Sequence, residues 1–295
     1  MLETLTLPAP AKLNRMLHIT GRRPDGYHTL QTLFQFLDVS DTLHFTPRHD
    51  DSITLSPALP GVAPEDNLVV RAARALQRES GCRYGVDITL EKRLPMGGGL
   101  GGGSSNAATT LLALNRLWET GFTYERLASI GLTLGADVPV FVHGQAAWAE
   151  GVGEVLTAVE LETPWFVVLH PGITVSTASV FNAPQLTRNT PPISMARALQ
   201  GGALAWHNDC QQTVFARYPE IARAHAWLSG FAPTMLTGTG ACLFARLTDE
   251  CEADSILQRV DAGWHAFKAK GCNRSPLHAA LEYGGMPVTS PSVTP

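Results

Sequence analysis

The amino-acid sequence predicts an α+β protein built from two modest domains. In some segments apolar residues alternate with polar ones, as in half-buried strands, and in others they recur at helical spacing. The two kinds of segment follow one another in a mixed order, which is typical of helices packed against a sheet. At 295 residues the chain is long enough for two cores. We therefore expect a first domain over residues 1–159, a second over 160–284, a flexible tail over 285–295, and a cleft between the domains.

The expected elements follow from local signals along the chain. An alternating pattern predicts a first strand over 12–20, and the turn Pro24–Gly26 separates it from the next. Asn67 caps a helix over 68–79, which ends at Gly81. Further strands are expected up to residue 37, over 41–46, 52–55, 86–90, 145–150, 165–170 and 264–268, and on both sides of 237–240, with further helices over 107–115, 123–134, 177–181, 194–199, 208–216, 220–228 and 249–260.

The composition excludes several classes of protein. A net charge of −4 does not suggest a basic surface of the kind that binds nucleic acid. No apolar run approaches the length of about 20 residues that a membrane span needs. The first ten residues lack the basic and apolar regions of a signal peptide. The five cysteines are widely spaced and form no metal-type pattern with histidine, which favours reduced thiols. We expect a cytoplasmic protein that binds neither nucleic acid nor a membrane and has no metal site made by a side-chain motif.

The most distinctive stretch runs from Pro95 to Asn106, where glycine fills every position of 97–103 except Leu100. A strand is expected before it and a helix after it, with Ser104 or Ser105 as the N-cap. Glycine lets the backbone approach a ligand closely, and the first N–H groups of a helix have no internal partner. Together these features predict an anion site, most often for phosphate. A flexible glycine-rich linker fits less well, because linkers are not flanked this tightly by a strand and a helix.

Two familiar phosphate loops do not explain this stretch. A Walker loop needs Lys followed by Ser or Thr after its last glycine, whereas Ser104 follows Gly103 directly. The spacing Gly97-x-Gly99-x-x-Gly102 formally matches a dinucleotide fingerprint, but that fold needs a second strand after the helix. The apolar spacing over 123–134 predicts a second helix instead, which argues against an NAD-dependent oxidoreductase.

Several polar residues leave two interpretations open when local sequence alone is considered. Lys12 and Asn14 share one face of the first strand, where they are either surface residues or part of a site. Tyr27 and His28 lie at a loop-to-strand junction, where binding residues are common and core aromatics also occur. Asp137 lies in a tight corner, where the usual role of aspartate is an N-cap.

The string from Pro95 to Ala108 closely resembles the ATP loop of the GHMP kinases, a family that includes the galactokinases, homoserine kinases and mevalonate kinases. The stretches 10–14, 23–32, 135–141 and 236–242 resemble one branch of that family, whose substrate carries a cytidine diphosphate. The resemblance covers nearly the whole chain. It implies an N-terminal nucleotide domain like ribosomal protein S5, a C-terminal ferredoxin-like α/β sandwich, and an active site in the cleft between them.

The same resemblance implies roles for individual residues. Lys12 and Asp137 match the catalytic positions, with Asp137 accepting or orienting the hydroxyl proton and Lys12 stabilising the negative charge that develops. Tyr27 and Phe181 match rings that stack on cytosine, and His28 matches a residue that bonds the base edge. The implied ATP-binding residues are Asn67, Pro95, Met96, Gly97, Gly98, Gly99, Leu100, Gly101, Gly102, Gly103, Ser104 and Ser105, and the implied substrate-binding residues are Asn14, Tyr27, His28, Thr177, Phe181, Gly238, Thr239 and Gly240.

The implied activity is direct phosphoryl transfer from ATP to the tertiary 2-hydroxyl of a cytidine-diphosphate-linked polyol in non-mevalonate isoprenoid biosynthesis. Mg²⁺ is implied as the counter-ion that ATP brings, with Ser104 or Ser105 as the candidate for its protein ligand. We expect a monomer or a weak homodimer. The alternatives are another GHMP kinase acting on a small alcohol, against which Tyr27, His28 and Phe181 argue, and a non-catalytic sensor of the same fold, against which the presence of Lys12 and Asp137 argues.

Overall fold

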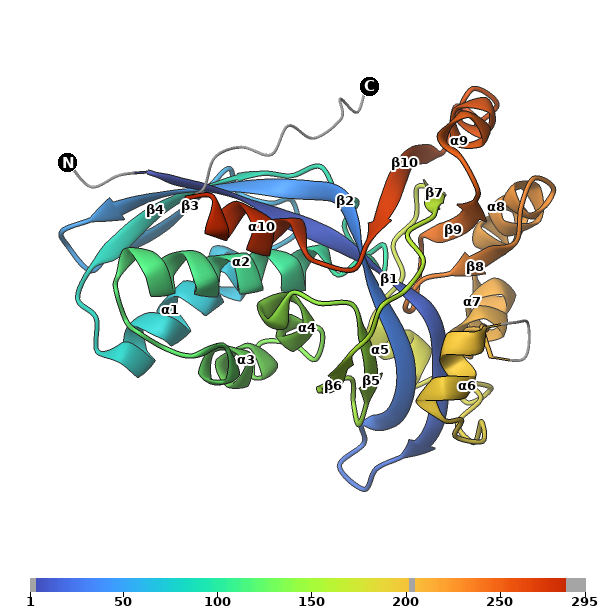
Figure 1. Cartoon of the computed structure of the whole chain (residues 1–295), viewed down its shortest axis with the longest axis horizontal. Coiled ribbons are helices and arrows are strands. Elements are labelled where there is room, and N and C mark those ends of the chain that lie inside the picture. The colour runs from blue at the N-terminus through green and yellow to red at the C-terminus, as the bar shows by residue number, and fades with distance from the viewer. Residues whose placement is uncertain (1–3, 202–204, 285–295) are drawn as a thin grey trace.

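Two long antiparallel strands run through the molecule and organise its sheet. The computed structural model describes residues 4–201 and 205–284. Strand β1 (Leu5–Arg22) pairs with β2 (His28–Arg48) along nearly its whole length. The expected strands ending at 37 and over 41–46 are therefore one continuous strand. Asp41 does not break it, because its buried carboxylate is bonded by the Lys92 ammonium and by backbone N–H groups. Both strands run from the left end of the molecule to its lower edge (Figure 1).

The first half of the molecule packs helices on one face of a sheet. The ladder β3-β4-β2 is extended by β1, β5 and β6, with β3 and β4 parallel and the other pairs antiparallel. Apolar side chains of this sheet and of its helices form one buried core. The elements are β3 (Ile53–Ser56), β4 (Gly85–Glu91), β5 (Ala147–Glu150), β6 (Val155–Ala158), the 3₁₀ turn η1 (Pro64–Asp66), α1 (Leu68–Ser80), α2 (Gly102–Leu117), α3 (Tyr124–Leu132) and α4 (Val138–His143).

The second half contains an antiparallel sheet in the order β10-β7-β9-β8 with its own core. The helices over 210–217, 219–229 and 250–257 lie on the outer, right-hand side of this sheet in Figure 1. The elements are β7 (Trp165–His170), α5 (Thr177–Phe181), α6 (Met195–Gln200), α7 (Cys210–Arg217), α8 (Pro219–Ser229), β8 (Thr234–Leu236), β9 (Leu243–Leu247), α9 (Glu250–Leu257) and β10 (His265–Cys272). This mixed arrangement confirms the α+β class.

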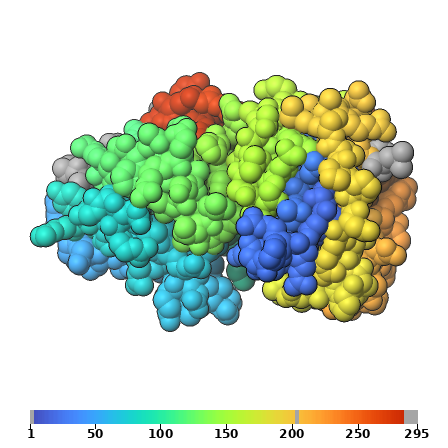
Figure 2. All heavy atoms as spheres, turned by 90° about the horizontal axis from the view of Figure 1, so that it is seen from below, coloured from blue at the N-terminus to red at the C-terminus, as the bar shows by residue number. Residues whose placement is uncertain are grey.

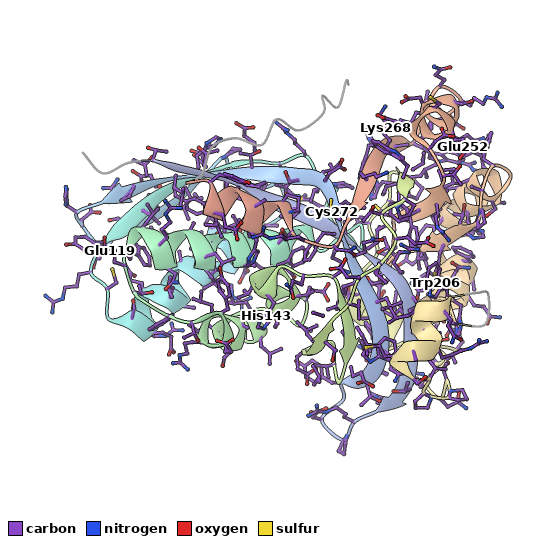
Figure 3. All side chains as sticks on the ribbon, in the orientation of Figure 1. Glu119, His143, Trp206, Glu252, Lys268 and Cys272 are labelled. Carbon is purple, nitrogen blue, oxygen red and sulfur yellow. The ribbon has the colours of Figure 1, made fainter. Side chains whose placement is uncertain are left out.

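The two halves meet at a short junction between β10 and β2, where Gly271 pairs with Leu37 and Cys272 with Phe36. Figure 3 places Cys272 at this junction, in the middle of the molecule. A separate apolar cluster fills the space behind it and includes Leu100 of the glycine stretch together with residues of β1, β7 and β9. The glycine stretch is thus anchored to both halves at once.

One helix near the end of the chain was not expected. Helix α10 (Pro276–Glu282) buries Leu277 and Ala280 in the core of the first half, although it follows the last strand of the second. The domain boundaries at 159 and 160 stay a prediction, and the tail over 285–295 lies outside the described residues. Within the described part of the chain, no helix has the length and apolarity that a membrane crossing requires.

Candidate active site

A single large cavity of about 890 Å³ collects most of the residues singled out from the sequence. It lies between β1, the glycine stretch, the corner before α4, and α5. Figure 2 shows the blue segment after β1 lying against the yellow segment around α5. The residues from the sequence analysis that line the cavity are Lys12, Asn14, Tyr27, His28, Asn67, Pro95, Met96, Gly97, Gly98, Gly99, Leu100, Gly101, Gly102, Gly103, Ser104, Asp137, Thr177, Phe181, Gly238 and Thr239. Ser105 and Gly240 do not line it.

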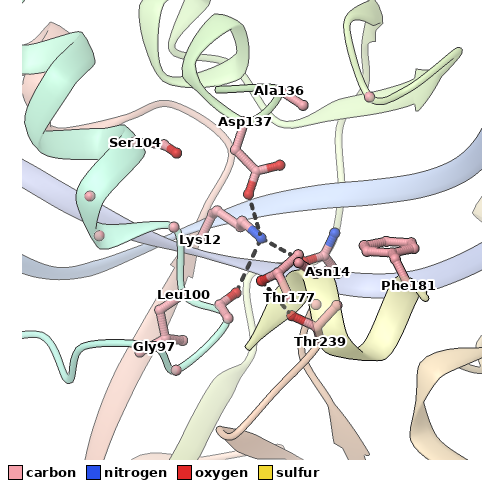
Figure 4. A pocket seen from close by; sticks show the side chains of 18 of the residues that line it. Lys12, Asn14, Gly97, Leu100, Ser104, Ala136, Asp137, Thr177, Phe181 and Thr239 are labelled. Atoms are coloured by element: carbon pink, nitrogen blue, oxygen red, sulfur yellow. Dashed lines mark hydrogen bonds and ion pairs between the residues drawn. The ribbon is translucent and has the colours of Figure 1, made fainter. Parts of the chain in front are cut away.

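Lys12 is held at the centre of this cavity, and only 2% of it is exposed. Its Nζ donates to Oδ1 of Asn14 at 2.6 Å and to the carbonyl oxygen of Gly99 at 3.1 Å, and lies 3.2 Å from Oδ2 of Asp137 (Figure 4). A buried ammonium needs such partners to offset the cost of leaving water. The interpretation of Lys12 as a surface residue is therefore wrong. Its ammonium lies between β1, the glycine stretch and the corner before α4.

Asp137 occupies the N-cap position of α4, but its side chain makes no capping hydrogen bond. A cap normally accepts from the second or third residue of the helix, and the second residue here is Pro139, which has no N–H. The side chain of Asp137 is instead 34% exposed and paired with Lys12. The carboxylate is thus available to a ligand in the cavity, as the family resemblance implies.

The glycine stretch adopts a conformation that other residues tolerate poorly. Gly97, Gly99 and Gly101 all have positive φ, between 65° and 75°. A Cβ on Gly99 would lie 2.2 Å from the carbonyl oxygen of Thr237, and one on Gly101 would lie 2.8 Å from the ring of Phe141. Helix α2 begins at Gly102 with Gly101 as its N-cap, so the expectation that Ser104 or Ser105 caps it is wrong. The positive end of this 16-residue helix opens directly onto the cavity.

The second glycine-containing loop, Thr237–Gly240, connects β8 to β9 and packs against the first. Backbone N–H groups of Ala241 and Cys242 donate to the carbonyls of Gly97 and Gly98 at 3.1 and 3.0 Å. The buried hydroxyl of Thr237 accepts from the Asn14 N–H at 3.0 Å and donates to the Gly99 carbonyl at 3.3 Å. The loop is therefore more than a hairpin turn, because it ties the glycine stretch to β1.

The predicted substrate side of the cavity is more open. Tyr27 is 64% exposed, whereas His28 is buried and its ring stacks on Phe181 with 5.1 Å between centroids. The hydroxyls of Thr177 and Thr239 are 3.0 Å apart and join α5 to the second glycine loop. The cavity thus has an aromatic end, formed by His28 and Phe181, and an opposite end at the glycine stretch that is suited to bind phosphate. Lys12 lies between the two ends.

The remaining sequence predictions have mixed outcomes. Asn67 lines the cavity and also caps α1, since its Oδ1 accepts from the Val69 N–H at 3.0 Å, so the two interpretations coexist. Ser105 is completely buried, its hydroxyl has no partner among the described residues, and it does not line the cavity. Gly240 lies behind the cavity wall against Leu236. The roles of Ser105 and Gly240 in ligand binding therefore stay predictions of the resemblance.

A magnesium ion carried by ATP would find suitable donors here. The Ser104 hydroxyl and the Asp137 carboxylate line the same cavity, and oxygen is the ligand that Mg²⁺ prefers. Ser104 lies next to the corner that carries Asp137, because its hydroxyl would be 3.6 Å from a Cβ on Gly135. Within residues 4–201 and 205–284, no group of three His, Cys, Asp or Glu side chains is arranged to hold a metal ion.

Three residues at or beside the site were missed in the sequence. Lys92 lines the cavity, and its Nζ would lie 3.2 Å from a Cβ on Gly102, so it adds a cation beside the glycine stretch. Its position next to that stretch was a usable signal. Asn106 lines the cavity with a buried Oδ1 that has no partner among the described residues. Arg188 bonds His28 from a segment far away in sequence, and nothing local indicated this contact.

Comparisons with known proteins agree with this geometry. Residues 67–145 match the model of the GHMP kinases N-terminal domain, and residues 194–266 match that of the GHMP kinases C-terminal domain. A protein of Chromohalobacter salexigens named 4-diphosphocytidyl-2-C-methyl-D-erythritol kinase is 66% identical over 95% of both chains. A protein of the same name from Pseudomonas savastanoi pv. phaseolicola is 58% identical over 94% of this chain and 96% of its own.

Solved structures show the same fold. A crystal structure of 4-(cytidine 5'-diphospho)-2C-methyl-D-erythritol kinase superposes with a TM-score of 0.78 at 32% identity, covering 90% of this chain and 99% of its own. The homoserine kinase of Cytophaga hutchinsonii, at 16% identity, a TM-score of 0.68 and coverage of 93% and 96%, shares the fold alone. These matches confirm the two-domain fold expected from the sequence. The chain therefore belongs to the GHMP kinase family, in the branch of the 4-diphosphocytidyl-2-C-methyl-D-erythritol kinases.

Proposed function

We propose that this chain transfers the γ-phosphoryl group of ATP to the 2-hydroxyl of 4-diphosphocytidyl-2-C-methyl-D-erythritol, giving the 2-phosphate and ADP in non-mevalonate isoprenoid precursor biosynthesis. The names of its close relatives supply the substrate. The observation that carries the chemistry is the pair formed by Lys12 and Asp137, with 3.2 Å between Nζ and Oδ2, at the point where the two glycine loops meet.

The glycine stretch and the start of α2 hold the triphosphate of ATP in this proposal. Backbone N–H groups at a helix start attract phosphate, and the positive φ values of Gly97, Gly99 and Gly101 let the chain curve closely around it. The Lys92 ammonium lies beside the loop, paired with the Asp41 carboxylate at 2.7 Å. Mg²⁺ bound to ATP would neutralise phosphate charge, and the Ser104 hydroxyl and the Asp137 carboxylate are oxygen donors in this cavity that could hold it.

The transfer itself joins the substrate hydroxyl oxygen to the γ-phosphorus. The bond from that phosphorus to the bridging oxygen breaks, and ADP leaves with the electron pair. The Asp137 carboxylate orients the hydroxyl and takes its proton, while the Lys12 ammonium stabilises charge on the transferring group. A tertiary alcohol is crowded, so holding it in line is expected to contribute more than basicity.

The aromatic end of the cavity provides that positioning. We place cytosine between Tyr27 and Phe181, with His28 at the edge of the base. A stacked base typically contributes about 1–3 kcal/mol. Asn14, Thr177, Gly238 and Thr239 line the path towards Lys12 and would face the diphosphate and the polyol. Gly240 supports this loop from behind.

One assay tests the proposal against its two alternatives. The protein is incubated with ATP and a panel of alcohols that includes the cytidylyl substrate, homoserine and mevalonate, and ADP release is followed. The proposal expects ADP only with the cytidylyl alcohol. Turnover of another alcohol would support a different GHMP activity, and tight ligand binding without ADP would support a sensor.

The cellular setting belongs to the same proposal. We infer a cytoplasmic enzyme, because all five cysteines are unpaired and two of them, Cys210 and Cys242, are buried as thiols. We expect a monomer or weak homodimer whose ligands are ATP and the cytidylyl polyol, with neither nucleic acid nor membrane as partner. Light scattering at micromolar concentration, with and without substrates, measures the oligomeric state.

A further inference from the structure

Arg188 connects the two aromatic residues His28 and Phe181 at the predicted substrate end of the cavity. Its Nη2 donates to the carbonyls of Phe181 and Ala183 at 2.8 and 2.7 Å, and Nη1 donates to Leu186 at 3.1 Å. The remaining donor, Nε, is 2.9 Å from Nε2 of His28. The guanidinium therefore fixes the end of α5, which carries the Phe181 ring, and contacts the imidazole on which that ring stacks.

The chemistry of the two groups determines where the proton of His28 resides. A guanidinium remains protonated in proteins and has five donors but no acceptor. The nitrogen that receives its hydrogen bond must therefore offer a lone pair, so Nε2 of His28 carries no proton. A neutral imidazole has one N–H, which must then be on Nδ1. Arg188 in this way selects one of the two tautomers.

The surroundings keep the imidazole neutral. His28 is 6% exposed, and burial, Arg188 and Arg22 all lower the pKa of its imidazole below the ordinary value. Nδ1 makes no hydrogen bond to any of the described residues, while the side chain lines the cavity. The ring can therefore offer one donor, Nδ1–H, to a ligand at this end of the cavity.

We propose that Arg188 is a positioning residue that determines which nucleobase the cavity accepts, by holding His28 as the donor tautomer. This inference rests on the proposed function, in which a pyrimidine binds here. Cytosine has acceptors at O2 and N3, whereas uracil has a donor at N3, so a fixed Nδ1–H pairs with the first and opposes the second. A site built around one hydrogen-bonding pattern strongly rejects a ligand that leaves its groups unpaired.

The tautomer can be read directly in the wild-type protein without any turnover. Nitrogen-15 NMR of the histidine side chains distinguishes a protonated from an unprotonated ring nitrogen, and a His28→Gln sample assigns the signals of this ring. We expect a protonated Nδ1 and an unprotonated Nε2 at pH 7.5. The opposite pattern, or a doubly protonated ring, would overturn the inference.

The base preference is measured with Arg188→Met and a matched control, Arg217→Met. Arg217 also donates to a carbonyl of α5, that of Ser179 at 2.6 Å, but makes no hydrogen bond to His28. Binding of CDP and UDP is measured by calorimetry with a non-hydrolysable ATP analogue present. We expect the wild type and Arg217→Met to prefer CDP about ten-fold or more, and Arg188→Met to lose most of that preference with its nucleotide-analogue affinity unchanged.

Each outcome separates this inference from the function on which it rests. A preserved CDP preference in Arg188→Met, or an equal loss in Arg217→Met, would refute the role of Arg188 even if the enzyme turns over its substrate. A wild type that binds neither CDP nor UDP would refute the proposed function. If Arg188→Met does not fold, Arg188→Lys keeps a positive charge but cannot maintain four hydrogen bonds, and it should lose the preference partially.

Discussion

The contact between Lys12 and Asp137 is the smallest unit on which the proposed activity depends. Neither residue is unusual in sequence, and each had a simpler local explanation. The structure removes the local explanation for both, because Lys12 is buried and the Asp137 side chain caps nothing. What remains is an ammonium and a carboxylate 3.2 Å apart, facing a cavity next to a phosphate-type loop.

Asp137→Asn separates chemistry from structure. We expect its turnover to fall by about 10²–10⁴-fold, because the amide cannot accept a proton as a carboxylate does. ATP and substrate affinities, measured by calorimetry, should change little, since the two side chains have nearly the same shape. Near-normal turnover, with unchanged stability, would show that the base lies elsewhere.

Some individual residues could be placed from sequence and others could not. The glycines of the ATP loop and the pair Lys12 and Asn14 were recognisable, because strand alternation and the motif place them locally. The burial of Lys12 was not, since it depends on the glycine stretch and on Phe34 of β2, which lie against its side chain. Arg188 was equally invisible, because its contact with His28 joins positions 160 residues apart.

At the scale of elements, the glycine stretch works because a second loop supports it. Gly101→Ala tests the first loop. Gly101 and Gly121 have almost the same φ, 72° and 70°, but a Cβ on Gly101 meets Phe141 and Lys12, whereas one on Gly121 meets nothing within 4 Å. Both substitutions should therefore cost about 1–2 kcal/mol of unfolding free energy through backbone strain.

Only Gly101→Ala should also weaken ATP binding, by at least about ten-fold, which corresponds to 1.4 kcal/mol. Calorimetry with ATP and denaturant titration of both variants provide the measurements. An unchanged ATP affinity in Gly101→Ala would remove this part of the loop from the nucleotide site.

Thr237 tests the second loop. Its hydroxyl bridges the Asn14 N–H and the Gly99 carbonyl, so Thr237→Val leaves both groups without this partner inside the protein. We expect a loss of about 1–3 kcal/mol in stability, with a raised KM for ATP. Thr237→Ser keeps the hydroxyl and should restore most of both properties. A defective Thr237→Ser beside a near-normal Thr237→Val would attribute the effect to packing of the methyl group instead.

Most elements were predictable because their signals are local. The strand before the glycine stretch, the cap of α1 and the short helix after Ser176 all follow from alternation or capping residues. The sequence-based predictions were wrong where groups far away in the sequence offset the effect of a local residue. One strand was expected to end at residue 37 and the next to begin at 41, yet β2 runs through 38–40 without a break, and the buried carboxylate of Asp41 is bonded by residues that follow β4.

At the scale of the whole molecule, β1, β2 and α10 hold the two halves together, because each of them contacts or connects both. The return of α10 to the first core was unpredictable, because nothing in its short apolar pattern indicates which core it joins. Leu277→Ala should lower the free energy of unfolding by about 2–5 kcal/mol, as expected for a fully buried leucine. Tyr283→Ala, at a residue that is 78% exposed, should change it by less than about 0.5 kcal/mol. Urea titration compares them, and equal small effects would place α10 outside the core.

The most direct test of the central claim is the position of the phosphate in the product. The carbon that bears the 2-hydroxyl of the proposed substrate carries a methyl group and no hydrogen. A phosphate on that oxygen therefore has no three-bond coupling to a proton, and proton-coupled ³¹P NMR of the reaction mixture should show a new phosphomonoester singlet that grows with ADP. A new monoester signal split by neighbouring protons, or ADP formation without any new monoester, would contradict the proposed reaction.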